Sequence, residues 1–310
     1  MAGHLRTVFF GSSDFSLPSL QRMLAEQEVV AVVSQPDRPA GRGLALTSTP
    51  VAKATREASA VLLLPRRLDG EFIAQIASLR PTLLACASYG KILPTNLLAI
   101  EGLRALNVHP SLLPEYRGAT PIQAALRDGR DQTGVTVFWM GAGTDDGDIA
   151  LSRSVQIDSD DNYGSLHDKL ARIGGDLLGE AAQRLSEGNL PRTPQRAEAA
   201  TYTRPITKED LRLRFDVPAR TVVNQIRSVS PKPGAWMTFE GKRLKVLEAN
   251  VVAHVSSRPE NAAPGDVVDW NELGPVIATS SGAICLTNVI PEGKPMMSGA
   301  EFAKRTKRNG

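Results

Sequence analysis

The chain has little cysteine, few aromatic residues and no long hydrophobic run. Only Cys86 and Cys285 are cysteines among 310 residues, and they lie far apart without the spacing of a metal site. Two reduced thiols are favoured over a disulfide, which stays the alternative. The apolar runs at residues 29–33 and 61–64 are far shorter than the roughly 18–20 residues that span a bilayer. No signal-peptide pattern precedes the first strand-like segment, so we expect a cytoplasmic chain that does not bind membranes.

Charge is nearly balanced overall but unevenly distributed. The 36 Lys and Arg residues exceed the 33 Asp and Glu residues by only three. Residues 204–310 hold 16 basic and 11 acidic residues, whereas the rest of the chain is slightly acidic. A basic C-terminal third favours a polyanionic partner, and a solvated surface is the simpler alternative. The length of the chain indicates two domains.

Strand-like and helix-like segments alternate through the first two-thirds of the chain. The predicted strands are residues 7–11, 29–34, 61–65, 82–88, 103–109, 134–140 and 149–157, and the predicted helices are residues 18–25, 50–58, 70–79, 120–129 and 165–187. Strands separated by such helices pair in parallel, and strands that are apolar throughout belong to a sheet covered on both faces. The fold class is therefore α/β, with an open sheet over residues 1–188 that binds ligands beyond the C-terminal ends of its strands.

The pattern changes after residue 188. Residues 189–205 contain three prolines and no hydrophobic period, which is typical of an interdomain linker. Residues 206–310 follow as a second domain, in which short strands are predicted at residues 243–249, 266–270, 276–280 and 283–288, beside a helix over residues 217–229. Short strands broken by Gly and Pro indicate a small β-barrel or sandwich.

The turn after the first strand does not fit a dinucleotide. A dinucleotide fingerprint needs three glycines, so that the backbone can approach the pyrophosphate closely. This turn has only Gly11, and the bulky Phe15 obstructs the approach. NAD binding is therefore disfavoured.

A polar pair at the end of one predicted strand is the strongest sign of chemistry. Asn107 and His109 are two residues apart, so both side chains lie on one face, about 6–7 Å apart. An amide and an imidazole can both donate hydrogen bonds to one oxygen, as stabilisation of an oxyanion in acyl transfer requires. No activated nucleophile is evident, because Ser111 lacks a Gly-x-Ser-x-Gly elbow. Direct attack by a substrate amine fits better than a covalent intermediate, and a purely structural role for the pair stays open.

A carboxylate is needed to orient the imidazole or to accept a proton from the amine. The Gly-bounded segment over residues 143–148 offers Asp145, Asp146 and Asp148 between two strands. The spacing is not that of a calcium loop, and we expect no metal. An acid–base role beside His109 and a plain surface turn explain these residues equally well.

These residues resemble those of the formyltransferases that use 10-formyltetrahydrofolate. The likeness begins with Asn107-x-His109-Pro110-Ser111-Leu112-Leu113-Pro114 and Arg117-Gly118-Ala119-x-Pro121-Ile122, and continues with Thr133–Thr136 and Asp145-x-Gly147-Asp148. Residues 35–43, 200–202 and 206–210 resemble the members that act on methionyl-tRNA, and residues 226–227, 233–235 and 291–294 extend the likeness into the second domain. The resemblance therefore covers nearly the whole chain.

The resemblance implies a Rossmann-like catalytic domain and a C-terminal oligonucleotide-binding-like (OB-like) barrel that binds tRNA. It implies Asn107, His109 and Asp145 as catalytic residues, 10-formyltetrahydrofolate as co-substrate and initiator methionyl-tRNA as partner. No dimer element is visible in the sequence, so we expect a monomer. Folate contacts are implied for Ser111, Leu112, Leu113, Pro114, Ser88, Tyr89, Gly90 and Ile92, and tRNA contacts for Arg38 and Arg42. One departure is that Leu44-Ala45-Leu46 stand where the family has lysines, which weakens the grip of this loop on phosphates.

Three other functions remain open from the sequence. The acceptor could be glycinamide ribonucleotide or an amino sugar nucleotide, although the basic second domain argues against a small acceptor. Water could replace the amine, which would make the chain a formyltetrahydrofolate hydrolase. A non-catalytic tRNA-binding protein would leave the spacing of Asn107, His109 and Asp145 as a coincidence.

Overall fold

The structure, a computed structural model, describes residues 5–40, 45–252 and 262–307. Within these ranges the chain forms two compact units. The N-terminal unit holds residues up to 118 together with 132–156 and 167–203, and the C-terminal unit holds residues 119–131, 157–166 and 204 onwards. The sequence-based division into two domains, residues 1–188 and 206–310 with a linker between them, stays a prediction.

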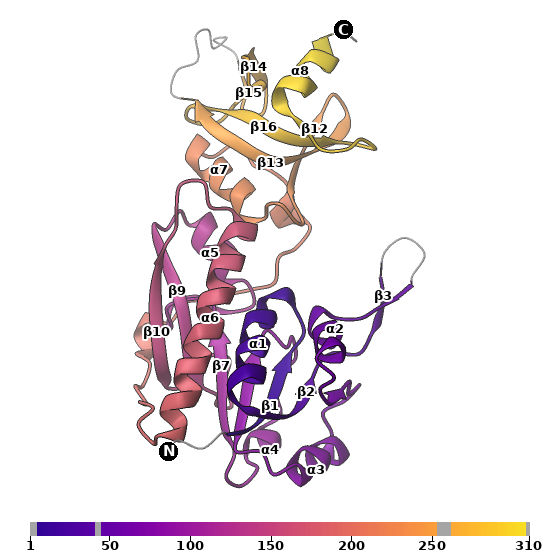
Figure 1. The fold of residues 1–310 in the computed structure, drawn as a ribbon. Helices are drawn as coiled ribbons and strands as arrows, with labels where there is room; N and C mark the ends of the chain where they lie inside the picture. The colour runs from indigo at the N-terminus through magenta and orange to yellow at the C-terminus, as the bar shows by residue number, and fades with distance from the viewer. Residues whose placement is uncertain (1–4, 41–44, 253–261, 308–310) are drawn as a thin grey trace. The chain divides into compact units, whose positions relative to one another are not determined.

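A mostly parallel sheet forms the centre of the N-terminal unit (Figure 1). Its strand order is β10-β9-β7-β6-β1-β2-β5, in which β7, β6, β1, β2 and β5 run parallel and β9 runs antiparallel to both of its neighbours, β7 and β10. The bounds are β1 Arg6–Gly11, β2 Glu28–Val33, β5 Leu62–Leu63, β6 Leu83–Ala87, β7 Arg104–His109, β9 Gln132–Trp139 and β10 Ile149–Gln156. The strand order reverses between β1 and β6, as in a Rossmann-like sheet. The predicted fold class of this unit is confirmed.

Helices cover both faces of this sheet. Residues of α3 (Gly70–Ser78) and α4 (Thr95–Leu98) share one buried cluster with Phe10 and Cys86. The other face meets α6 (Tyr163–Ser186), since a Cβ added at Gly174 would lie 2.8 Å from Val108 Cγ1. Helix α1 (Leu17–Glu26) lies beside α6, and α2 (Pro50–Glu57) follows the β3–β4 hairpin. Successive side chains of a strand point to opposite faces, so Asn107 and His109 point away from α6.

Several short elements of the N-terminal unit were not predicted. They are the hairpin β3 (Arg38–Ala40) and β4 (Ala45–Thr47), the turn η1 (Asp14–Ser16) and the strands β8 (Arg117–Gly118) and β11 (Tyr202–Thr203). Strand β11 pairs in parallel with β8, and Thr193 bridges Ile149 of β10. Residues 190–203, which include the turn η2 (Ala197–Ala199), therefore pack on the N-terminal unit as part of its structure.

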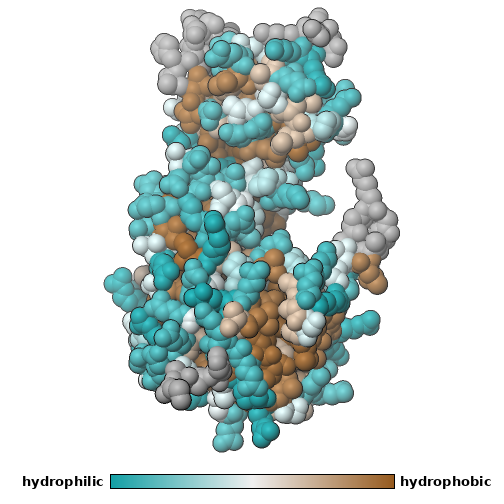
Figure 2. All heavy atoms as spheres, viewed as in Figure 1, coloured by the Kyte–Doolittle hydropathy of each residue, from teal (hydrophilic) through white to brown (hydrophobic). Residues whose placement is uncertain are grey.

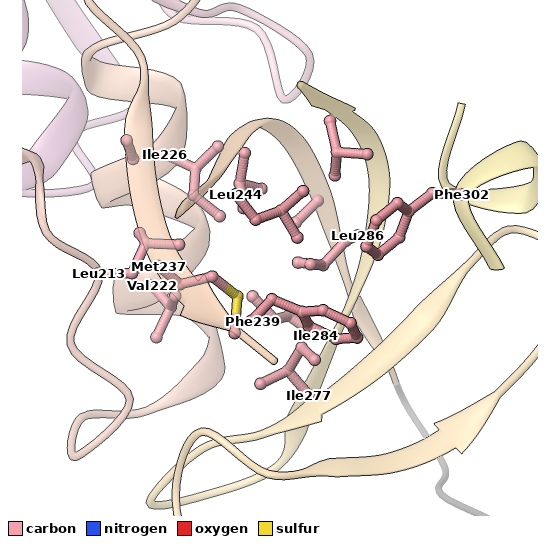
Figure 3. Close-up of a cluster of buried hydrophobic side chains, with 14 of the residues drawn as sticks. Leu213, Val222, Ile226, Met237, Phe239, Leu244, Ile277, Ile284, Leu286 and Phe302 are labelled. Carbon is pink, nitrogen blue, oxygen red and sulfur yellow. The ribbon is translucent and has the colours of Figure 1, made fainter. Parts of the chain in front are cut away.

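An antiparallel sheet forms the core of the C-terminal unit. Its order is β12-β13-β16-β15-β14, and β17 pairs with β16. The bounds are β12 Ala235–Phe239, β13 Lys242–Val252, β14 Val267–Trp270, β15 Pro275–Ala278, β16 Ala283–Pro291 and β17 Met297–Ser298, with helices α5 Pro121–Arg127, α7 Ala219–Ser228 and α8 Gly299–Lys307 and the turn η3 Glu209–Leu211. Figure 3 shows Val222 and Ile226 of α7 and Phe302 of α8 packed around the side chains of these strands. The short strands are confirmed, and their closure into a barrel stays a prediction.

The surface of the molecule is mostly hydrophilic on the face drawn in Figure 2, where hydrophobic residues gather in patches on both units. In the part of the chain that the structure describes, no helix is both long enough and apolar enough to span a membrane.

Candidate active site

Two loops meet beyond the C-terminal ends of β6 and β7. The strands are parallel neighbours in which Ala87 pairs with Val108, so residues 88–92 and 110–118 leave the same edge of the sheet. This is the edge where open α/β sheets bind ligands. The segments predicted to contact folate are therefore adjacent in the structure.

The imidazole of His109 is buried and held at both nitrogens. Its Nε2 lies 2.9 Å from the carbonyl oxygen of Tyr116, which can only accept, so Nε2 carries a proton and donates it. Its Nδ1 faces Asp145 Oδ2 at 3.6 Å, which is within ion-pair range but too long for a hydrogen bond. We expected Asp145 to orient the ring, whereas the Tyr116 carbonyl makes the direct hydrogen bond.

Asp145 is itself fixed in place by the backbone. Its Oδ2 accepts a hydrogen bond from the Gly118 N–H at 2.8 Å, and this same oxygen faces His109. Asp145 adopts a left-handed conformation with φ of 51°, and Tyr116 has φ of 57°. Such conformations are costly in non-glycine residues and often occur at functional sites.

Asn107 carries an unused polar atom. Its Oδ1 is buried and has no hydrogen-bond partner among the described residues. Asn107 pairs in register with Cys86, whose pKa burial raises to about 12, with Asp145 adding to the rise. The Tyr89 hydroxyl is also buried without a described partner, and burial raises its pKa to about 12. Buried polar atoms are normally satisfied, so orphaned atoms at a strand end fit a site that a polar ligand completes.

The segment after His109 is held rigidly. The Ser111 side chain is fully buried and donates to the Glu115 carbonyl at 2.6 Å, so its hydroxyl has a partner within the loop. The Leu113 N–H donates to Thr136 Oγ1 on β9, and the Leu113–Pro114 peptide is cis. Leu112 and Pro114 are half-buried.

The loop after β6 combines a buried anchor with exposed residues. Tyr89 packs edge-to-face on Phe10 with the ring centroids 5.2 Å apart. Ser88 and Gly90 are exposed and adopt positive φ, and the Ser88 hydroxyl accepts a hydrogen bond from Ser13. Ile92 is 88% exposed, so its side chain is accessible at this edge of the sheet.

The two arginines predicted to contact tRNA belong to the β3–β4 hairpin. Arg38 is exposed on β3 and donates to Gln35 Oε1 at 2.5 Å. Arg42 lies outside the described residues. Figure 1 shows β3 at some distance from the sheet of the N-terminal unit.

Sequence reasoning missed the groups that hold Asp145 and His109 in place. The Gly118 N–H and the Tyr116 carbonyl are backbone groups, which a pattern of side chains does not reveal. Arg117 was noted in the motif without a role, yet it is buried and donates to Gln195 Oε1 at 2.8 and 3.1 Å. Gln195 lies in the segment interpreted as a linker, and no sequence signal distinguishes it.

No group of three or more His, Cys, Asp or Glu residues is placed to hold a metal ion within residues 5–40, 45–252 and 262–307. Asp145, Asp146 and Asp148 lie in one loop, and Asp148 is paired with Arg192 at 3.9 Å. The acidic loop supplies one carboxylate, that of Asp145, to His109.

Comparison with known proteins decides the family. A sequence model described as "Formyl transferase" matches residues 5–182, and one described as "Formyl transferase, C-terminal domain" matches residues 205–307. The first match alone covers more than half of the chain. The chain belongs to the formyl transferase family. The resemblance seen in the motifs is thereby confirmed, and the chain is an enzyme of the formyltransferase class.

Curated members of the formyl transferase family align with nearly the whole chain. A "Methionyl-tRNA formyltransferase" of Pelotomaculum thermopropionicum is 39% identical over 97% of this chain and 96% of its own length. Proteins with the same name from Carboxydothermus hydrogenoformans and Staphylococcus aureus are 37% and 36% identical, each over 96% of this chain.

Solved structures of formyl transferase relatives share the fold. An N-formyltransferase from Helicobacter canadensis, solved with folinic acid and dTDP-3-aminofucose, has a TM-score of 0.67 and covers 93% of this chain and 98% of its own. HypX from Aquifex aeolicus, solved with tetrahydrofolic acid, has a TM-score of 0.62 and covers 97% of this chain and 47% of its own. Both are 16% identical to this chain, so they bear on the fold alone.

Proposed function

We propose that this formyltransferase moves the formyl group of 10-formyltetrahydrofolate to the free α-amino group of initiator methionyl-tRNA, with Asn107, His109 and Asp145 at the reaction centre. The product is N-formylmethionyl-tRNA for translation initiation. The contact between His109 and Asp145 at the C-terminal end of β7, on the strand face that Asn107 shares with His109, supports the chemical part of the proposal. The relatives named methionyl-tRNA formyltransferase, 36–39% identical over nearly the full length, support the acceptor and the folate co-substrate.

In this mechanism, His109 and Asn107 donate hydrogen bonds to the oxygen of the formyl group. Negative charge develops on that oxygen when the amine nitrogen adds to the formyl carbon. The Nε2–H of His109 is committed to Tyr116, so Nδ1–H is the ring donor left for the oxygen. The side-chain Nδ2 of Asn107 is the second donor, whereas its buried Oδ1, which has no described partner, can only accept a hydrogen bond. Two donors aimed at a developing oxyanion are the main requirement of acyl transfer without a nucleophilic residue.

Asp145 stabilises positive charge on the His109 ring and accepts the proton that the amine releases. Its negative charge lies 3.6 Å from Nδ1 and stabilises positive charge that develops on the ring during the reaction. As the amine nitrogen becomes positive, a carboxylate beside it can accept the released proton. The bond between the formyl carbon and N10 then breaks, N10 takes up the proton that the amine released, and tetrahydrofolate leaves with the formyl group remaining on the amine.

The proposed folate contacts follow the two loops at this edge. Ser88, Gly90 and Ile92 present an exposed rim, and Tyr89 offers its buried hydroxyl. Leu112, Leu113 and Pro114 line the opposite loop next to His109. Ser111 acts by fixing this loop, because its hydroxyl already donates to Glu115.

The C-terminal unit offers a basic surface for the tRNA. A hollow of about 500 Å³ is lined by Lys242, Arg243, Lys294 and Arg305 around Phe239, and Glu240 and Glu292 also lie on its rim. Basic side chains of this kind contact phosphates and position a nucleic acid without reading its sequence. The Arg38 and Arg42 hairpin is the proposed contact for the acceptor end. We propose a monomer that acts in the cytoplasm, where charged initiator tRNA is found.

A panel of acceptors tests the function. The full chain is incubated with 10-formyltetrahydrofolate and either initiator methionyl-tRNA, glycinamide ribonucleotide, a dTDP-amino sugar or no acceptor. We expect formylmethionine after mild base hydrolysis of the ester, with folate release that depends on the charged tRNA. Faster formylation of a small acceptor would contradict the proposed substrate. Equal folate release without any acceptor would identify a hydrolase instead, and binding of tRNA without transfer would identify a binding protein.

A further inference from the structure

The side-chain amide of Gln195 uses its full hydrogen-bonding capacity at the acidic loop. Its Nε2 donates to the carbonyl oxygens of Asp145 at 2.8 Å and Gly147 at 2.7 Å. Its Oε1 accepts from Arg117 Nε at 3.1 Å and from a terminal nitrogen of the same guanidinium at 2.8 Å. A primary amide has two donors and can accept two hydrogen bonds, so all four positions are used.

The orientation of this amide is dictated by its neighbours. Carbonyl oxygens can only accept and a guanidinium can only donate, so exchanging the amide oxygen and nitrogen would turn all four contacts into repulsions. Arg117 is 5% exposed and also donates to the Tyr202 hydroxyl at 3.1 Å. The guanidinium is thus held between the amide and β11.

Gln195 and Arg117 connect the two backbone segments that determine where the Asp145 carboxylate lies. One segment is the loop over residues 145–147, held by the two Gln195 donors. The other is β8, where the residue after Arg117 is Gly118, whose N–H holds Asp145 Oδ2. A left-handed residue such as Asp145 persists only where its surroundings fix it. Gln195 contributes to this fixation, because its amide is hydrogen-bonded to the loop over residues 145–147 on one side and to Arg117 on the other.

We propose that Gln195 is a positioning residue for formyl transfer, which acts by holding the Asp145 loop against Arg117 so that the carboxylate faces His109. The inference rests on the proposed function, in which that carboxylate stabilises the protonated ring. It assigns a role in the reaction to a segment that the sequence presents as a linker. Gln195 itself touches neither substrate nor the reacting atoms.

Gln195→Glu separates positioning from general stability. The carboxylate keeps two acceptors for Arg117 and adds an ion pair, but it presents an oxygen to the carbonyls of Asp145 and Gly147, which then repel it. Gln195→Met removes all four hydrogen bonds but keeps a side chain of similar length. Gln156→Glu, at an exposed position on β10 of the same unit, makes the same change of charge and serves as the control.

Steady-state kinetics with methionyl-tRNA and 10-formyltetrahydrofolate give the first result. We expect kcat of Gln195→Glu to fall about 10- to 100-fold with KM for both substrates within about threefold, since small displacements of a catalytic group cost that much. The melting temperature should stay within a few degrees of wild type. A parallel loss of melting temperature and kcat in Gln195→Glu, or wild-type kcat in both Gln195 variants, would overturn the proposal.

A double-mutant cycle shows whether Gln195 acts through Asp145. In an Asp145→Asn background, Gln195→Glu should slow the enzyme by less than about threefold, because the carboxylate it positions is gone. Equal fold-losses in the two backgrounds would show that Gln195 acts independently of Asp145, against the proposal.

Amide hydrogen exchange tests the same claim without any substrate. The Gly118 N–H should exchange at least about tenfold faster in Gln195→Met than in wild type, because its acceptor is no longer held. Unchanged exchange would contradict the inference whatever the enzyme does. If wild-type chain formed no formylmethionine while exchange at Gly118 rose as expected, the proposed function would fail and the positioning of Asp145 would stand.

Discussion

Replacing Asp145 by Asn removes one negative charge and changes little else. The side chain keeps its size, and an amide oxygen can still accept the hydrogen bond from Gly118. What is lost is attraction between the carboxylate and the positive charge that the proposed mechanism places on His109, 3.6 Å away. At an effective dielectric constant of 20 this attraction is worth about 4–5 kcal/mol. The side chains are only 5% and 16% exposed, so solvent screens little of it.

Such a loss corresponds to about three orders of magnitude, since 1.4 kcal/mol is a factor of ten. The loop and the neighbouring dipoles relax, so we expect single-turnover formylation of methionyl-tRNA to slow by about 10²- to 10³-fold. The reaction is quenched in acid, the ester is hydrolysed and formylmethionine is counted, at saturating 10-formyltetrahydrofolate. A rate within about threefold of wild type would refute the reasoning, because a neutral residue would then serve as well as the carboxylate.

Three further substitutions or reactions test other parts of the account. Asn107→Ala should cost about 10²- to 10³-fold in single-turnover rate with folate affinity little changed, and the exposed Asn96→Ala should cost nothing. Gly118→Ala should lower the free energy of unfolding in denaturant titration by at least about 2 kcal/mol, since φ is 102° and the added Cβ would lie 2.5 Å from the Thr203 carbonyl oxygen. The Cys86 thiol, whose pKa burial raises to about 12, should not react with a disulfide reagent at pH 8 until the chain unfolds. Wild-type rates, an unchanged unfolding curve or rapid labelling of native Cys86 would contradict these expectations in turn.

The parts of the fold that the sequence predicts are those with a strong local period. Strands β1, β2, β6 and β7 are runs of apolar residues, and the long helix α6 has a clear amphipathic pattern, so their positions follow from the sequence. The pairing of β8 with β11 could not be foreseen, because each strand has two residues and their partners are 85 positions apart. Strand β12 and helix α8 were missed as well, although Pro233-Gly234 and Glu240-Gly241 bound β12.

Part of the candidate site could be predicted from the sequence for a similar reason. Asn107 and His109 stand two apart on one strand, so periodicity alone places them on one face. Asp145 approaches them from a loop between β9 and β10, and no local pattern predicts where a loop folds. The contact of His109 with Tyr116 and the four contacts of Gln195 depend on backbone carbonyls and on long-range packing. Only the folded chain reveals them.

The most direct test of the central claim compares wild type with His109→Ala in a single turnover on initiator methionyl-tRNA, with folate affinity measured separately. We expect wild type to transfer one formyl group per active site. The variant should bind 10-formyltetrahydrofolate with affinity close to wild type and transfer its formyl group at least about 100-fold more slowly. Transfer by His109→Ala at the wild-type rate, or no formylmethionine from wild type, would contradict the account.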